Sequence, residues 1–186
     1  MTSPGMRADA RRNRERVLAA AEEVFGERGA TASTEEVARR AGVGIGTVFR
    51  HFPTKEELYE AIVVRRLSRL LEEAPVDTDD AAEAFRSFFT RIVDEAAAKK
   101  AFADTMAVVA IDVTKSTSGA GDKIRDTIGV LLARAQAAGA IRSDVTKAEV
   151  MVLLAGACMA ADRTADVDLR NRSLSVLFDG LAPRRT

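Results

Sequence analysis

Residue types on which many enzymes and disulfide-stabilised proteins depend are scarce in this sequence. Its 186 residues include one cysteine, one histidine, one tyrosine and no tryptophan. A lone cysteine excludes a disulfide within the chain, and the apolar neighbours of Cys158 predict a core residue, with a redox-sensing thiol as the alternative. A lone histidine excludes a histidine-rich metal site. Because a glycine-rich phosphate loop is absent as well, we expect neither an enzyme nor a metal or cofactor site.

Long apolar runs and strand-like patterns are also absent. No apolar run reaches the roughly 18 residues that suggest a membrane span, and the N-terminus is charged where a signal peptide would be apolar. We therefore expect a cytoplasmic protein without membrane association. Only four prolines occur, and no long stretch alternates between apolar and polar residues. Because half-buried strands alternate with period two, this pattern predicts an all-α fold.

The charges balance overall but are unevenly distributed. Residues 1–70 carry 13 Arg and Lys against 10 Asp and Glu, whereas residues 71–186 carry 15 against 18. The basic excess is densest near the N-terminus, at Arg7, Arg11, Arg12, Arg14 and Arg16. Such clustering is typical of phosphate binding, although a solvated helix face gives the same pattern.

Apolar spacing and helix-start signals divide the chain into about nine helices. Three segments have the capping-box form that begins a helix, namely Ser33–Glu36, Thr54–Glu57 and Thr146–Glu149. Pro53 and Pro75 limit the helices that precede them. The predicted helices cover, approximately, residues 9–28, 34–42, 44–52, 55–74, 78–100, 101–113, 122–138, 147–161 and 168–181.

The second and third predicted helices are too short to bury a core alone, so the first helix must complete it. Candidates for this core are Val17, Phe25, Val37, Ala38, Val43, Val48, Phe52 and Leu58. Gly42 lies where the chain has to bend sharply between the two short helices. Three helices in this order predict a helix-turn-helix, which places one short helix in the major groove of DNA.

The outer face of the third predicted helix carries the DNA-binding candidates. They are Ile45, Thr47, Phe49, Arg50 and His51, which follow Gly44 at the N-cap position. Ile45 and Thr47 are short enough to reach base edges such as a thymine methyl group. The N-terminus of the helix attracts phosphate through its free N–H groups and its partial positive charge. Arg11 and Arg12 add cationic candidates from the basic N-terminal segment.

Residues 13–58 resemble the N-terminal domain of the TetR family of one-component transcriptional regulators. The matching segments are Arg16–Ala21, Phe25, Arg28–Gly29, Glu36–Ala38, Ala41–Val43, Gly46–Phe52 and Lys55–Leu58. The resemblance implies a recognition helix over residues 45–51 in which Thr47 contacts DNA. It also places His51, Lys55 and Thr34 at phosphate contacts, and for His51 the structural alternative is to close the helix.

Two positions depart from the family pattern within this segment. Phe49 stands where the family usually has tyrosine, so a phenolic hydroxyl that binds phosphate is absent. Gly44 stands where serine is frequent, which costs a few tenths of a kcal/mol in helix capping. Neither departure argues against DNA binding, but both change the list of contacts.

The C-terminal part contains no diagnostic chemistry, and its apolar pattern predicts a helical bundle. Residues 84–100 and 131–144 resemble the SbtR-type effector domain of TetR regulators, which implies a small-molecule effector. The predicted pocket is lined by Phe85, Phe88, Phe89, Ile92, Phe102, Met106, Val109, Met151 and Cys158. Ordinary core packing is the alternative for each of these residues. The pocket residues favour a small apolar or amphipathic ligand.

Within the predicted helix over residues 147–161, the stretch Val150–Ala161 is apolar on all sides. A helix on the surface of a monomer keeps a polar face, so we expect a partner subunit to cover part of it. TetR proteins dimerise through their last two helices, which agrees with this expectation. The predicted interface residues are Leu153, Leu154, Ala157, Leu174 and Leu177.

The sequence therefore predicts a three-part organisation. A flexible basic arm covers residues 1–10, a helix-turn-helix domain residues 11–56, and an effector-binding and dimerisation domain residues 57–186, with the helix after Thr54 as the connector. We expect a homodimeric repressor that binds a palindromic operator in double-stranded DNA and is released by an effector. The alternative is an activator or architectural protein that binds DNA without a ligand.

Overall fold

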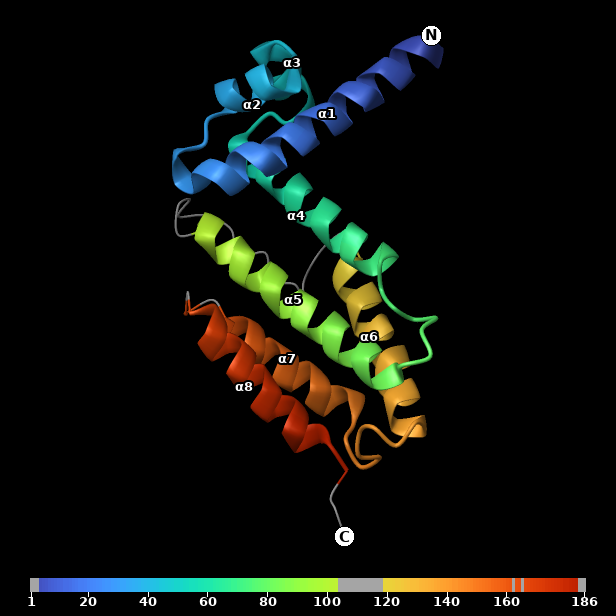
Figure 1. Cartoon of the computed structure of the whole chain (residues 1–186). Helices are drawn as coiled ribbons and strands as arrows, with labels where there is room; N and C mark the ends of the chain where they lie inside the picture. Colours follow the sequence, from blue (N-terminus) through green and yellow to red (C-terminus); the bar gives the residue numbers. More distant parts are fainter. Residues whose placement is uncertain (1–3, 104–118, 162, 165, 184–186) are drawn as a thin grey trace. The chain divides into compact units, whose positions relative to one another are not determined.

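The computed structural model describes residues 4–103, 119–161, 163, 164 and 166–183, and every regular element in this part is a helix (Figure 1). This confirms the predicted all-α class. The elements are α1 (Pro4–Arg28), a short 3-10 helix η1 (Gly29–Thr31), α2 (Thr34–Ala41), α3 (Ile45–His51), α4 (Lys55–Glu72), α5 (Ala81–Ala103), α6 (Ala120–Ala137), α7 (Lys147–Ala161) and α8 (Val167–Leu181).

The described helices form two compact units. The first unit contains residues 4–65 and 101–103, and the second contains residues 66–100 and the described residues from 119 onward. We predicted a boundary after residue 56. The observed division lies later because the first turns of α4 contribute Leu58, Tyr59 and Ile62 to the core of the first unit.

The N-terminal segment differs from the predicted flexible arm. α1 begins at Pro4 and already includes the residues that we assigned to the arm from that point on. Proline is favourable in the first turn of a helix, where its missing N–H has no partner to lose. The next residues include Met6, Arg7 and Ala8, which are good helix formers. Intrinsic helix propensity therefore favours a longer α1.

The core of the first unit joins α2 and α3 to one side of α1 (Figure 1). Its buried residues are Val17, Leu18, Ala20, Ala21, Val24, Phe25, Ala32, Val37, Ala38, Ala41, Val48, Phe52, Leu58, Tyr59 and Ile62. This confirms the predicted core except at Val43, which is only partly buried. Ala20, Ala32, Ala41 and Tyr59 are also buried and were not predicted.

The core of the second unit is built around phenylalanine. Phe85, Phe88 and Phe89 of α5 are fully buried. The ring of Phe178 in α8 packs edge-on against Phe89 at a centroid distance of 5.4 Å and against Phe85 at 6.4 Å. Aliphatic residues complete this core, namely Ile92, Val93, Ile124, Ile128, Leu131, Leu132, Val150, Leu154, Leu174 and Leu181.

Polar contacts join the helices of the second unit at several places, including the following two. The Arg134 guanidinium of α6 donates to the backbone oxygens of Val76 and Thr78, which holds the segment between α4 and α5. Arg170 of α8 pairs with Asp94 of α5 at 3.0 Å. We predicted a separate helix over residues 101–113. Residues 101–103 instead continue α5, and residues 104–113 lie outside the described part. Among the described residues, no helix combines the length and apolar character needed to span a membrane.

Candidate nucleic-acid interface

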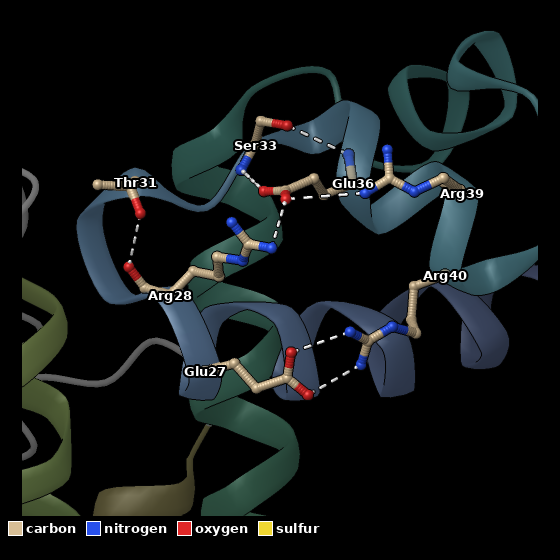
Figure 2. A network of polar contacts seen from close by, with 7 residues as sticks. All are labelled: Glu27, Arg28, Thr31, Ser33, Glu36, Arg39 and Arg40. Carbon is tan, nitrogen blue, oxygen red and sulfur yellow. Dashed lines mark hydrogen bonds and ion pairs between the residues drawn. The ribbon is translucent and has the colours of Figure 1, made fainter.

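The N-terminus of α2 is held by the predicted capping box. The hydroxyl of Ser33 accepts a hydrogen bond from the backbone N–H of Glu36 at 3.1 Å, and the Glu36 carboxylate accepts one from the N–H of Ser33 at 3.3 Å (Figure 2). These bonds satisfy two donors that a helix start leaves unpaired. These bonds define where α2, the first of the two short helices of this site, begins.

Ion pairs on the surface join α1 to α2. Glu36 lies 3.5 Å from Arg28 of α1, and Arg40 of α2 donates to both oxygens of Glu27 at 3.0 and 2.9 Å (Figure 2). Arg40 also donates to Glu23 at 3.1 Å. The hydrogen bond from Arg40, with its charge, lowers the pKa of the Glu27 carboxyl, and the same hydrogen bond raises the pKa of Arg40.

The turn between α2 and α3 depends on Gly42. Its φ of 64° is a left-handed conformation that side chains disfavour. The N–H of Gly42 donates to Arg39 at 3.2 Å, and the N–H of Val43 donates to Ala38 at 3.0 Å, which closes the end of α2. From α1, Arg16 Nη2 donates to the carbonyls of Ala41 at 2.6 Å and Gly42 at 3.2 Å.

α3 presents a short exposed surface that one buried residue anchors. Val48 is completely buried, whereas Ile45 and Phe49 are 37% and 44% exposed. Arg50 is exposed beside them, and Thr47 is half-buried. The N-cap Gly44 makes no side-chain hydrogen bond to the helix. The predicted outer face of α3 therefore combines two apolar side chains with a cation and a hydroxyl.

Lys55, at the start of α4, is engaged within the protein. Its ammonium donates to the carbonyl of Ala32 at 2.7 Å and lies 5.4 Å from the ring centre of Phe25. An ammonium carries three N–H donors, so two remain after the bond to Ala32. Lys55 therefore joins α4 to the segment before α2 and still has donors to offer to phosphate.

The other predicted DNA-binding residues lie at the surface of the same unit. His51 and Thr34 are half-buried, at the end of α3 and the start of α2. Arg11 and Arg12 are exposed on α1, and Arg12 pairs with Asp9. Among the described residues, no carboxylate pairs with Arg11. The structure thus brings cations from α1, α3 and α4 into one unit.

Several contacts that support this site were not predicted. They involve Arg16, which bonds to residues 25 and 26 positions away, and Arg40, which bonds to residues 13 and 17 positions away. No local pattern marks such pairs, because they depend on how α1 and α2 pack. A basic run such as Arg11–Arg16 gives no sign of which cation is used internally.

Six of the nine predicted effector-lining side chains lie in the described part of the chain. Phe85, Phe88, Phe89 and Ile92 are buried, and Met151 and Cys158 are half-buried on α7. Met106 and Val109 lie outside the described residues, as does the side chain of Phe102. The rings of Phe85 and Phe89 contact each other and Phe178, which is the packing expected of a core.

Two open grooves lie elsewhere on the second unit. One, of about 240 Å³, runs between α5 and α8 and is lined by residues that include Arg86, Thr90, Asn171 and Phe178. The guanidinium of Arg86 lies 5.7 Å from the ring centre of Phe178. The other groove, of about 440 Å³, lies between the end of α6 and the chain after α8. Neither groove contains a predicted effector-lining residue.

The predicted dimer residues are only partly at the surface. Leu153 is 38% exposed, and Ala157 and Leu177 are half-buried. Leu154 and Leu174 are buried within their own unit, which leaves them little surface to offer to a partner. An apolar pattern on all sides of a helix does not show which side faces its own core. The large apolar residues that α7 and α8 expose are Val152, Leu153, Met159, Val167, Leu169 and Val176.

Two protein-family models match the chain and together cover most of it. Residues 17–62 match the model of bacterial regulatory proteins of the tetR family, and residues 80–183 match the C-terminal domain of SbtR-like transcriptional regulators. The second match alone covers more than half of the chain. Proteins of this family are DNA-binding regulators that form homodimers, and they are not enzymes.

Solved structures of similar sequence support the same assignment. A TetR transcriptional regulator from Streptomyces coelicolor is 35% identical, and the similarity covers 92% of this chain and 99% of that chain with a TM-score of 0.71. A TetR regulatory protein from Mycobacterium vanbaalenii is 37% identical, with coverage of 96% and 99% and a TM-score of 0.70. An HTH-type transcriptional regulator from Staphylococcus aureus is 34% identical over 76 residues, and this match spans 41% of that curated relative.

Proposed function

Because the chain belongs to the TetR family of transcriptional regulators, we propose that it is a repressor that binds a palindromic operator as a homodimer. It acts in the cytoplasm and leaves the operator when a small effector binds to the second unit. One observation carries the DNA-binding part of this proposal. The outer face of α3 exposes Ile45 and Phe49 beside Arg50, while buried Val48 anchors the helix.

In this proposal α3 enters the major groove. Ile45 and Thr47 read base edges near the N-terminus of the helix, where side chains approach the groove floor. Phe49 packs against sugar and base atoms, and Arg50 adds a positive charge. Phosphates are bound by His51, Lys55, Thr34, Arg11 and Arg12, and by the N-terminus of α3 after Gly44.

The homodimer is supported by the exposed apolar residues of α7 and α8. Val152, Gly156 and Met159 recur at spacings of four and three residues on α7, which places them on one face. Leu169 and Val176 are seven residues apart on α8 and share a face in the same way. Large apolar side chains exposed along one face of a helix support a protein interface. Two recognition helices then read two half-sites of a palindrome.

The effector site is proposed in the second unit beside the buried phenylalanines of α5, with Met151 and Cys158 on its α7 side. The ligand is small and apolar or amphipathic. Its binding shifts the dimer toward a state with lower DNA affinity, typically by about 1–3 kcal/mol of coupling. One observation favours a regulator without an effector. The rings of Phe85, Phe89 and Phe178 pack against one another, as in an ordinary core, and so occupy space that a ligand would need.

The proposal is tested by selecting duplexes from a random library with the purified chain. We expect a palindromic consensus and an affinity that falls steeply as salt rises. The variant Thr47→Ala should change the selected consensus. Thr31→Ala removes a hydroxyl that donates to the carbonyl of Arg28 and should leave the consensus unchanged. An absence of salt-sensitive duplex binding, or an identical consensus for Thr47→Ala, contradicts the proposed reading of bases.

A further inference from the structure

Four carbonyl groups at the end of α2 receive hydrogen bonds from two sources. A helix C-terminus leaves its last carbonyls without partners from the helix itself. The N–H groups of Gly42 and Val43 reach back to the carbonyls of Arg39 and Ala38. The carbonyls of Ala41 and Gly42 receive hydrogen bonds from Arg16 on α1. A cation here also complements the partial negative charge of the helix end.

One nitrogen of Arg16 makes both of these bonds. Nη2 carries two hydrogens, and it lies 2.6 Å from the Ala41 oxygen and 3.2 Å from the Gly42 oxygen. Nη1 of the same guanidinium lies 3.5 Å from the Asn13 side chain. Arg16 therefore spans the space between α1 and the turn, although it belongs to the basic segment assigned to phosphate binding.

Gly42 provides the space for this guanidinium. A Cβ atom at position 42 would lie 2.9 Å from Arg16 Nη2, which is closer than such atoms approach. Only Val43 and Gly44 separate Gly42 from the first residue of α3. The direction in which α3 leaves the turn is therefore set at the point where Arg16 binds.

We infer that Arg16 is a positioning residue for the recognition helix and does not bind phosphate. By holding the carbonyls of Ala41 and Gly42, it maintains the angle between α1 and α3. Sequence-specific contacts require α3 to enter the groove at one angle, whereas non-specific contacts to phosphates tolerate variation. This inference rests on the proposed function, because it assigns Arg16 to the alignment of α3 on an operator.

The test compares Arg16→Met with Arg11→Met in the full-length chain. Both variants remove one positive charge from α1, but Arg11 pairs with no carboxylate among the described residues. Each variant is measured against the duplex selected by the wild-type chain and against a scrambled duplex of the same composition. Affinities are determined over a range of salt concentrations, and thermal unfolding confirms that each variant is folded.

For Arg16→Met we expect about tenfold weaker operator binding, because hydrogen bonds that involve a charged group contribute about that factor to an equilibrium constant. Binding to the scrambled duplex and the salt dependence should stay as in the wild type. For Arg11→Met, a phosphate ligand, both duplexes should bind more weakly and the salt slope should fall by about one unit.

The variant Arg16→Lys distinguishes the effect of the positive charge from that of the guanidinium geometry. It also replaces Arg16→Met in the test if that variant does not fold. It retains the charge but not the guanidinium, so we expect weaker operator binding with unchanged binding to the scrambled duplex. Wild-type operator affinity in Arg16→Lys, or a reduced salt slope in Arg16→Met, overturns the inference alone. A wild-type chain that binds no duplex overturns the proposed function, and the inference with it.

Discussion

The two units differ in where they leave large apolar side chains exposed. In the described part of the first unit these are Ile45 and Phe49, both on α3. In the second unit, α7 and α8 alone expose six such residues, namely Val152, Leu153, Met159, Val167, Leu169 and Val176. The small patch suits a DNA groove, where methyl groups and sugars are within reach. The larger one suits a second copy of the chain.

The units also differ in how their helices are held together. In the first unit, ion pairs and capping bonds on the surface supplement a small core, as between Arg40 and Glu27. In the second unit, fully buried phenylalanine rings from α5 pack against Phe178 of α8. A short recognition helix cannot bury much area, so its orientation depends on individual polar contacts. A bundle with a large core depends on them less.

The largest expected effect concerns the apolar face of the second unit. Val152→Glu and Val176→Glu place a charge at residues that are each 72% exposed. If the face is covered by a second subunit, burying that charge costs on the order of 3 kcal/mol, or about a hundredfold in the dissociation constant. We expect monomers by sedimentation velocity and loss of operator binding, with the fold of each subunit retained.

Val130→Glu is the matched control for these variants. Val130 is 51% exposed on α6, which is not one of the two helices assigned to the interface. The Val130→Glu variant should remain dimeric and bind the operator as the wild type does. A dimer that persists in Val152→Glu and Val176→Glu would place the interface on another surface. It would contradict the assignment of the exposed apolar residues of α7 and α8 to a second subunit.

An intermediate effect is expected at the turn of the first unit. Gly42→Ala forces a side chain into φ 64°, which costs about 1–2 kcal/mol. The new methyl group also displaces Arg16, so we expect lower stability in urea unfolding together with weaker operator binding. Gly26→Ala, in α1 and with open space around it, should instead be neutral or slightly stabilising. Equal unfolding midpoints for the two variants would contradict the strain at Gly42.

The smallest effect compares two carboxylates, one in each unit. The pKa of Glu27 is lowered by its hydrogen bond to Arg40, and the pKa of Glu149 is lowered by hydrogen bonds from the backbone and hydroxyl of Thr146. A carboxyl whose pKa is lower in the folded state stabilises the fold above its unfolded value. That stabilisation is lost as the pH falls below the ordinary value of 4.5 toward the folded pKa.

Salt separates these two causes. The exposed ion pair of Glu27 is screened by salt, whereas the capping bonds of Glu149 are local and largely insensitive to it. In an NMR titration, added sodium chloride should raise the pKa of Glu27 toward 4.5 and leave that of Glu149 nearly unchanged. Arg40→Gln should raise the pKa of Glu27 in the same way. A similar salt response at both carboxyls would contradict this assignment.

Local signals in the sequence were sufficient for the helix starts and for the core of the first unit. The capping boxes of Ser33 and Thr146 form reciprocally as predicted, and the hydroxyl of Thr54 accepts a hydrogen bond from the N–H of Glu57. Gly42 turns the chain where expected. These features depend on residues within a few positions of one another, so the sequence contains all their partners.

Nothing local identifies the inner side of α7 or the role of Arg16. The face of an all-apolar helix that meets its own core depends on neighbouring helices, which is why Leu154 and Leu174 are buried whereas Val152 and Val176 are exposed. The sequence by itself determined the helical class, the helix-turn-helix and the family. Tertiary packing decided which cations remain for DNA and which apolar residues remain for a partner, because both depend on contacts between residues far apart in the chain.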